Sequence, residues 1–182
     1  MDTNGDTRMT SKLKTDVLET VSGSGTIALT NQLSGMTSAS MPSGSVLQTV
    51  TANTNTAVTT TSSTYSATGL TASITPTSTS SKILVSVSQN GIYKDGNNTN
   101  GIDIRLVSNG GSAMDIVLAG RAAGDSAGVF SIGSVSGTFL NSPNSTSSIT
   151  YRTDFRAVSN TNTAYVQVYS STSSITLMEI QG

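Results

Sequence analysis

Residues 101–111 read "GIDIRLVSNGG" and carry the clearest structural pattern in the chain. Apolar and charged side chains alternate along this stretch: Ile102, Ile104 and Leu106 are separated by Asp103 and Arg105. In an extended strand such alternation places the apolar residues on one face and the charged residues on the other. The Asn-Gly pair at 109–110 is typical of a tight turn between antiparallel strands. The stretch therefore predicts a half-buried β-strand that ends in a turn.

The same pattern recurs on both sides of this strand. Three further stretches alternate in this way: "GLTASITP" (69–76), "SKILVSVSQ" (81–89) and "SITYRTDFRAV" (148–158). Gly, Asn, Ser and Pro separate such stretches, so that eight to ten short strands follow one another at even spacing, which is typical of a sandwich or barrel. We predict an all-β fold, an antiparallel jelly-roll-like β-sandwich over residues 41–182 with a short extended N-terminal segment.

Composition narrows the classes of function. Only 10% of the residues are charged and 4% are aromatic, whereas Ser and Thr supply roughly a third of the chain. The net charge of −1 gives no basic surface for phosphates, so we expect no nucleic-acid partner. The chain has neither Cys nor His, which removes disulfides and the usual transition-metal ligands. No apolar run is long enough to span a membrane. We therefore expect no cofactor and no membrane insertion.

The first 40 residues differ from the rest of the chain. Charged residues are frequent before residue 20, and the next one is Lys82. The two apolar stretches "DVLETV" and "GTIAL" flank the turn-forming "SGSG" and are too short to form a core alone. We predict that residues 1–40 form an extended segment for oligomerisation or attachment to another protein. A disordered tail is the alternative.

One motif resembles an enzyme signature. The sequence "GDSAG" (124–128) fits the pattern around a nucleophilic serine, here Ser126. A serine nucleophile needs a base, which is normally an imidazole, and this chain contains no histidine. We therefore interpret the motif as a turn between strands and expect no enzymatic activity.

Several longer stretches resemble a known group of proteins. They are "LKTDVLETVSGSGTIALTNQLSG" (13–35), "MPSGSVLQ" (41–48), "SITPTSTSSKILV" (73–85) and "SSITLMEI" (173–180). Together they resemble tail-fibre and virion-surface proteins of phages that infect marine bacteria. The resemblance implies a homotrimeric fibre end or spike, made in the bacterial cytoplasm and carried on the virion. It also implies a C-terminal sandwich similar to tumour-necrosis-factor and complement globular heads, which attaches the particle to a host glycan or protein.

Two polar stretches are predicted to be the loops that contact the receptor, "YKDGNNTN" (93–100) and the segment 120–126. The residues that we select as receptor contacts are Tyr93, Lys94, Asp95, Asn97, Asn98, Arg121 and Asp125. Loops on a rigid sheet are common binding sites, and Tyr and Arg are favoured contact residues. The first loop also offers oxygen ligands for calcium, but their spacing does not fit a known calcium loop.

Two alternative functions remain from the sequence. The protein could be a structural decoration or adaptor protein of the phage tail or capsid, bound to other virion components through its N-terminal segment. A glycan depolymerase would need paired carboxylates, for which Asp103, Asp115 and Asp154 are the candidates. A further pattern, the charge row Arg152, Asp154 and Arg156, is predicted either to be solvated or to cross a subunit interface.

Overall fold

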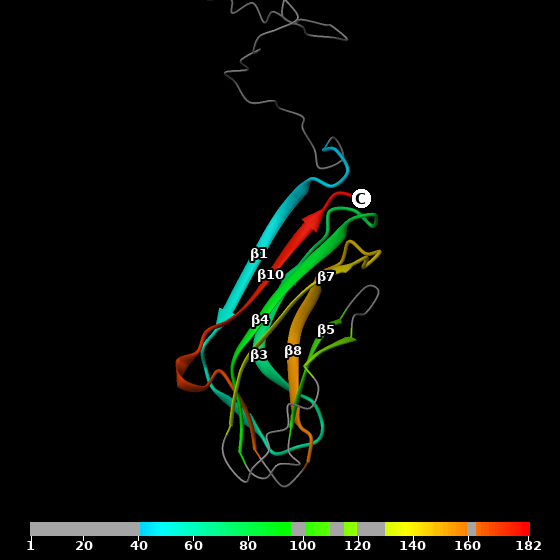
Figure 1. Cartoon of the computed structure of the whole chain (residues 1–182). Coiled ribbons are helices and arrows are strands. Elements are labelled where there is room, and N and C mark those ends of the chain that lie inside the picture. The colour runs from blue at the N-terminus through cyan, green and yellow to red at the C-terminus, as the bar shows by residue number, and fades with distance from the viewer. Residues whose placement is uncertain (1–40, 96–100, 110–114, 120–129, 160–162) are drawn as a thin grey trace, which may run out of the picture. The chain divides into compact units, whose positions relative to one another are not determined.

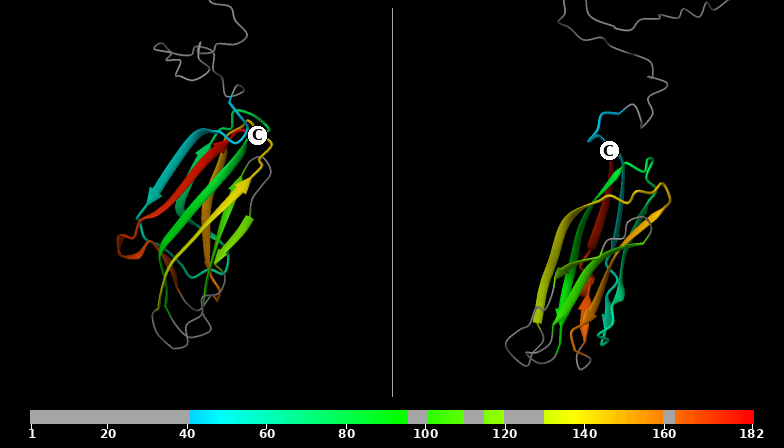
Figure 2. Two further views of the ribbon diagram at one scale, coloured as in Figure 1. Left: turned by 45° about the horizontal axis from the view of Figure 1, so that its top comes forward. Right: turned by 90° about the vertical axis from the view of Figure 1, so that its right-hand side faces the viewer.

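The computed structural model describes residues 41–95, 101–109, 115–119, 130–159 and 163–182, which belong to one compact unit, Thr37–Gly182. The N-terminal segment 1–40 lies outside the described residues, and so do the predictions made for it. Within the described part, the chain forms strands and one short 3-10 helix, η2 (Val168–Ser170). Two antiparallel sheets face each other (Figures 1 and 2), which confirms the predicted β-sandwich.

The first sheet, called sheet A, is built around the longest strand, β4. Its strands are β1 (Val46–Thr54), β2 (Val58–Thr60), β4 (Lys82–Lys94), β7 (Phe130–Asn141), β9 (Ala164–Val166) and β10 (Ser173–Ile180). β7 pairs with β4 from Ile83 to Lys94, and β10 and β9 pair with successive parts of β4. β1 then pairs with β10, and β2 with β9.

The second sheet, called sheet B, has the strand order β3-β8-β5-β6. Its strands are β3 (Ser66–Ile74), β5 (Ile102–Asn109), β6 (Asp115–Ala119) and β8 (Ile149–Ala157). The chain passes repeatedly from one sheet to the other, as in a jelly roll of two Greek keys. Most paired strands, such as β1 with β10 and β3 with β8, are far apart in the sequence, so neither sheet can be completed before distant parts of the chain have met.

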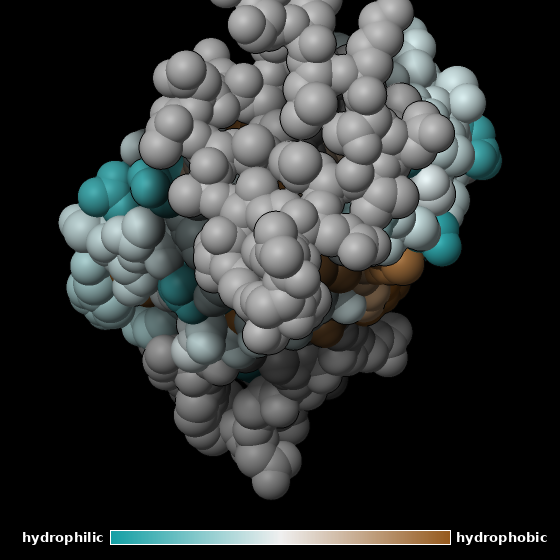
Figure 3. Space-filling model, turned by 90° about the horizontal axis from the view of Figure 1, so that it is seen from above, coloured by the Kyte–Doolittle hydropathy of each residue, from teal (hydrophilic) through white to brown (hydrophobic). Residues whose placement is uncertain are grey.

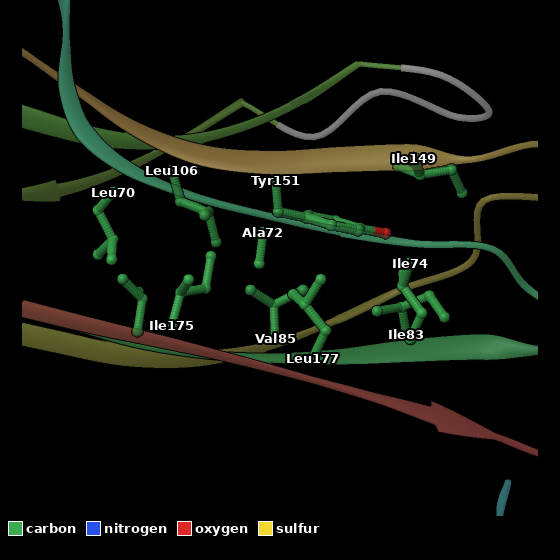
Figure 4. Close-up of a cluster of buried hydrophobic side chains, with 11 residues drawn as sticks. Leu70, Ala72, Ile74, Ile83, Val85, Leu106, Ile149, Tyr151, Ile175 and Leu177 are labelled. Atoms are coloured by element: carbon green, nitrogen blue, oxygen red, sulfur yellow. The ribbon is translucent and has the colours of Figure 1, made fainter. Parts of the chain in front are cut away.

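The apolar faces of the two sheets form the core between them. In Figure 4, side chains from sheet B point toward side chains from sheet A, and the aromatic ring of Tyr151 lies among them. The buried members of this first cluster are Leu70, Ala72, Ile74, Ile83, Val85, Val87, Leu106, Ile149, Tyr151, Ile175 and Leu177. A second cluster fills the other end of the sandwich with Ile92, Ile102, Ile104, Phe155, Ala157, Ala164 and Val166. Each fully buried Ile or Leu stabilises the fold by roughly 1.5–3 kcal/mol.

A layer of buried polar side chains lies between the two clusters along the strands. The Thr153 hydroxyl donates to Gln89 Oε1 at 2.8 Å and lies 2.6 Å from the Thr68 hydroxyl. Gln89 Nε2 donates to Ser173 Oγ at 3.0 Å. All four residues are fully buried. Since Thr68 and Thr153 belong to sheet B and the other two to sheet A, this chain of hydrogen bonds joins the sheets and fixes how they are aligned.

A buried carboxylate closes the end of the core where β10 ends. Glu179 is fully buried, and its Oε1 accepts from both the backbone N–H and the hydroxyl of Thr77 at 2.7 Å. Its Oε2 accepts from Gln48 Nε2 at 2.6 Å. Burial by itself would raise the pKa of Glu179, but the hydrogen bonds from Gln48, Ser81 and Thr77 outweigh it and hold this pKa below its ordinary value. The ionised carboxylate therefore fastens the β3–β4 connection to β10.

This arrangement predicts a dependence of stability on pH. Because the folded pKa of Glu179 lies below that of the unfolded chain, its stabilising contribution is present above about pH 4.3 and is lost as the pH falls through the folded pKa. Glu179→Gln should lower the free energy of unfolding at pH 7 by about 1–3 kcal/mol, since an amide nitrogen would face the donors. The difference from wild type should shrink below pH 4, as measured by urea unfolding. Asp115→Asn, at an exposed ion pair, should change stability by less than about 0.5 kcal/mol at either pH.

Candidate functional site

Three of the five tyrosines gather at the end of β4. We call Tyr93, Tyr165 and Tyr169 the tyrosine cluster. The ring of Tyr93 lies 5.7 Å from that of Tyr165 and 6.4 Å from that of Tyr169, both in edge-to-face geometry. Tyr93 and Tyr165 are register partners on β4 and β9, so they emerge side by side on the outer face of sheet A. Tyr169 extends from η2 and is 85% exposed.

The position of Tyr93 depends on a β-bulge at Gly91. In β4 the odd-numbered residues from Ile83 to Gln89 are buried, but after the register shifts around Gly91 the even-numbered Ile92 and Lys94 are buried instead. One extra residue in a strand reverses which side chains face the core. The bulge therefore turns Tyr93 outward, where it meets the other two tyrosines.

The turn that carries Tyr169 has an unusual backbone. Gln167, Tyr169 and Ser170 all have positive φ, between 55° and 58°, which non-glycine residues seldom adopt. Asn90 of β4 anchors this turn twice, since its carbonyl oxygen accepts from Gln167 N at 3.0 Å and its Nδ2 donates to the Thr172 carbonyl oxygen at 2.6 Å. Strained backbone persists only where the surrounding structure enforces it, and it is common at binding sites.

Asp95 orients the second tyrosine of the cluster. Its Oδ2 accepts from the Tyr165 hydroxyl at 3.0 Å, and its Oδ1 accepts from Thr163 N at 2.7 Å. Partial burial of Tyr93, together with the charge and hydrogen bond of Tyr169, raises the pKa of the Tyr93 phenol above its ordinary value. The Tyr93 phenol therefore stays neutral over the physiological pH range, and Asp95 holds Tyr165 beside it.

The structure places three of the seven selected receptor-contact residues. Tyr93 lies in the cluster, and Asp95 supports it, although both were predicted to lie in a loop. The prediction for Lys94 was wrong: Lys94 is the last residue of β4 and is only 1% exposed, because the bulge at Gly91 turns it toward the core side. The other four selected residues lie outside the described part of the chain: Asn97, Asn98, Arg121 and Asp125. Ser126 lies outside it as well.

Sequence reasoning missed Tyr165 and Tyr169. Alternation along "TAYVQVYS" (163–170) indicates a single strand, but β9 ends at Val166 and the turn begins at Gln167. Continued alternation would have put Gln167 on the same face as the two tyrosines, whereas its side chain is buried. The only signal in the sequence was the concentration of tyrosines in a chain with few aromatic residues.

Six charged residues gather on the outer face of sheet B. Asp103 pairs with Arg156 at 2.7 Å, and Asp154 pairs with Arg105 at 3.2 Å and with Arg152 at 2.9 Å. Asp115 also pairs with Arg105, and the ring of Tyr65 covers both Arg105 and Arg156. The charge row on β8 is thus paired within the chain. All three candidate carboxylates of a depolymerase are engaged by arginine side chains.

The outer face of sheet A is uncharged along three successive rows across β1, β10, β4 and β7. Strand register defines the rows as Thr49-Met178-Leu84-Leu140, Thr51-Thr176-Ser86-Thr138 and Asn53-Ser174-Ser88-Ser136. The middle row consists of hydroxyl groups, two pairs of which are hydrogen-bonded. Seen from above, the described surface is mostly hydrophilic or neutral, with a hydrophobic area on one side (Figure 3). Beyond these rows, Lys82 at the start of β4 is exposed on sheet A. The three rows are therefore a neutral area, whereas the outer face of sheet B carries six paired charges.

No group of three or more acidic side chains suited to a metal ion occurs among the described residues. In the same part of the chain, no helix is long and apolar enough to cross a membrane. Comparison of the chain with protein-family models gives no match, and comparison with curated proteins gives none either. The class that the fold defines is an all-β jelly-roll sandwich. The fold alone does not identify a function for this chain, so the function is inferred from the tyrosine cluster and from the resemblance to phage surface proteins.

Proposed function

We propose that this chain is a non-enzymatic phage virion protein, a tail fibre or spike, whose β-sandwich head attaches the particle to its host cell. The observation that carries the proposal is the tyrosine cluster, in which an almost fully exposed Tyr169 stands on a strained and anchored turn. Exposed tyrosines held by a rigid scaffold are frequent anchors of binding sites. The sequence resemblance to phage surface proteins supplies the biological setting.

In this proposal the head acts by multivalent binding. A single site of this size binds weakly, but several copies on one spike and many spikes on one particle multiply the effective affinity. Residues 1–40, which lie outside the described part of the chain, hold the head to other virion proteins. Attachment then requires only recognition, with no bond made or broken.

A binding experiment on cells tests this function. Fluorescently labelled full-length protein should bind a bacterium that is susceptible to the phage, and pre-incubation with the protein should reduce infection. Protein that joins virions but binds no susceptible cell would contradict host attachment and support the adaptor function instead.

The same proposal includes a homotrimer, and the neutral face of sheet A is the surface we assign to it. Interface centres are depleted in charge, and this face carries an apolar row with Leu140 55% exposed. The outer face of sheet B, with three arginines and three aspartates in ion pairs, is far less suited to burial. Closed rings of identical subunits are the usual outcome of such association.

Leu140→Lys should therefore dissociate the trimer, because three buried ammonium groups would enter the interface. Light scattering should give three times the chain mass of 18.5 kDa for wild type and a single chain for the variant. Val117→Lys is the matched control, since Val117 is similarly exposed (59%) but lies on sheet B, and this variant should remain trimeric. A wild-type monomer at micromolar concentration would contradict the trimer, and dissociation by Val117→Lys alone would contradict the choice of face.

A further inference from the structure

We infer that the tyrosine cluster is a binding site for a neutral saccharide, with the ring of Tyr169 as the platform for a sugar ring. This inference rests on the proposed function and adds to it a site and a class of ligand. It follows from the exposure of the rings, the rigidity of their support and the charges around them.

The geometry leaves a ring face available. Tyr169 meets Tyr93 at an interplanar angle of 83°, so the two rings touch by an edge and do not stack. The electron-rich face of an aromatic ring attracts polarised C–H groups, and pyranose sugars present such groups on one side. Ser170 and Thr172 are exposed beside Tyr169 and offer hydroxyl groups for the polar edge of a sugar. The cluster thus combines an apolar platform with hydrogen-bonding groups, as saccharide recognition requires.

The platform is fixed before any ligand arrives. Three residues of positive φ hold the turn in a conformation that a free chain would seldom adopt, and Asn90 secures it from β4. Gln167 Nε2 further ties the turn to the buried Ser173 hydroxyl. A preordered site loses little conformational entropy on binding, which matters for a ligand that gains little energy from each contact.

The charges near the cluster favour a neutral ligand. Asp95 is the carboxylate beside the tyrosines, and both of its oxygens already accept hydrogen bonds. Lys94, the neighbouring cation in β4, is buried on the opposite side of the strand. A sulfated or carboxylated sugar would be repelled by the Asp95 carboxylate, whereas a neutral sugar would not. The apolar row of the proposed trimer face, with Leu84 and Leu140, lies about 30 Å from Tyr93 along β4.

A glycan array that carries neutral and acidic oligosaccharides tests the inference with full-length protein. Wild type should bind neutral glycans and bind acidic ones more weakly. Tyr169→Ala should lower the array affinity at least about tenfold, whereas Tyr169→Phe, which keeps the ring, should stay within about threefold of wild type. Tyr65→Ala removes a tyrosine that lies against Arg105 and Arg156 of sheet B, and this variant should bind as wild type does.

Several results would overturn the saccharide site. They are a preference for acidic glycans, no binding to any glycan on the array, or equal binding by Tyr169→Ala. A change in the oligomeric mass of Tyr169→Ala would show that the cluster contacts a second copy instead. Cell binding separates this inference from the proposed function. Wild type that attaches to cells but binds no neutral glycan contradicts only the site, and glycan binding without cell attachment contradicts only the function.

Discussion

Ile104→Asp should leave no folded protein. Ile104 is fully buried in the middle of β5, within the cluster that also holds Phe155 and Val166. The substitution removes a packed side chain and places an unpaired carboxylate between the sheets, so that both a cavity and a desolvated charge oppose folding. We expect the free energy of unfolding to fall by about 5 kcal/mol or more, which is the whole stability of many domains. Circular dichroism and size-exclusion chromatography of the soluble fraction measure the loss.

Val117→Asp is the matched control for this variant. Val117 lies on the neighbouring strand β6, is exposed, and pairs in register with Arg105 on the outer face of sheet B. A carboxylate there meets solvent and a guanidinium, so the stability should change by less than about 1 kcal/mol. Equal yields of folded protein from Ile104→Asp and Val117→Asp would show that β5 does not face the core as described.

Gly91→Ala should have the second largest effect, both on stability and on the tyrosine cluster. Gly91 has φ +60°, and a methyl group on it would lie 2.7 Å from Val168 N, 2.9 Å from Val168 O and 2.8 Å from Ser171 Cβ. Two of these atoms belong to the backbone of the turn and cannot move alone. We expect a loss of about 2–4 kcal/mol and a displaced Tyr169. Thermal unfolding and the NMR signals of the three tyrosine rings measure the two effects.

Gly69→Ala separates backbone strain from steric contact. Gly69 also has positive φ, +87°, but a methyl group on it would meet nothing within 4 Å. This variant should therefore lose only the free energy that comes from backbone strain, about 1–2 kcal/mol, and its tyrosine NMR signals should be unchanged. If both variants lost the same stability and neither moved the tyrosines, the close packing of the turn on β4 would not constrain the site.

The alternation of apolar residues was enough to predict the sandwich. Ile102, Ile104 and Leu106 face the core as expected, and so do the apolar residues of β3, β4 and β8 that the sequence placed together. In each of these strands every second residue is apolar. Burying these side chains together on one face stabilises the strand more than any local conformational preference opposes it. Of the candidate site, the sequence supplied Tyr93 and Asp95 only.

The polar residues could not be placed in the same way. Ser86 and Ser88 face outward, whereas Thr153, Ser173 and Gln89 are buried and hydrogen-bonded between the sheets. A polar side chain can form its hydrogen bonds with water or with a buried partner at similar free energy. The residue type alone therefore does not decide whether the side chain faces solvent or the core. The hydrogen-bond partners of these buried side chains come from four different strands, β3, β4, β8 and β10, and are brought together only in the folded structure.

The sequence by itself determined that the chain forms short antiparallel strands and which apolar residues enter the core, because those preferences depend on neighbours along the strand. The tertiary structure alone decided the site. Gly91 has positive φ, and the turn at Val168 packs against β4 there without room for a side chain. That contact joins residues far apart in the sequence, and the bulge beside it reverses the faces of Tyr93 and Lys94. Alternation of apolar and polar residues predicts which side chains face the core only where the strand is regular. It could therefore not predict that a bulge reverses the faces of Tyr93 and Lys94.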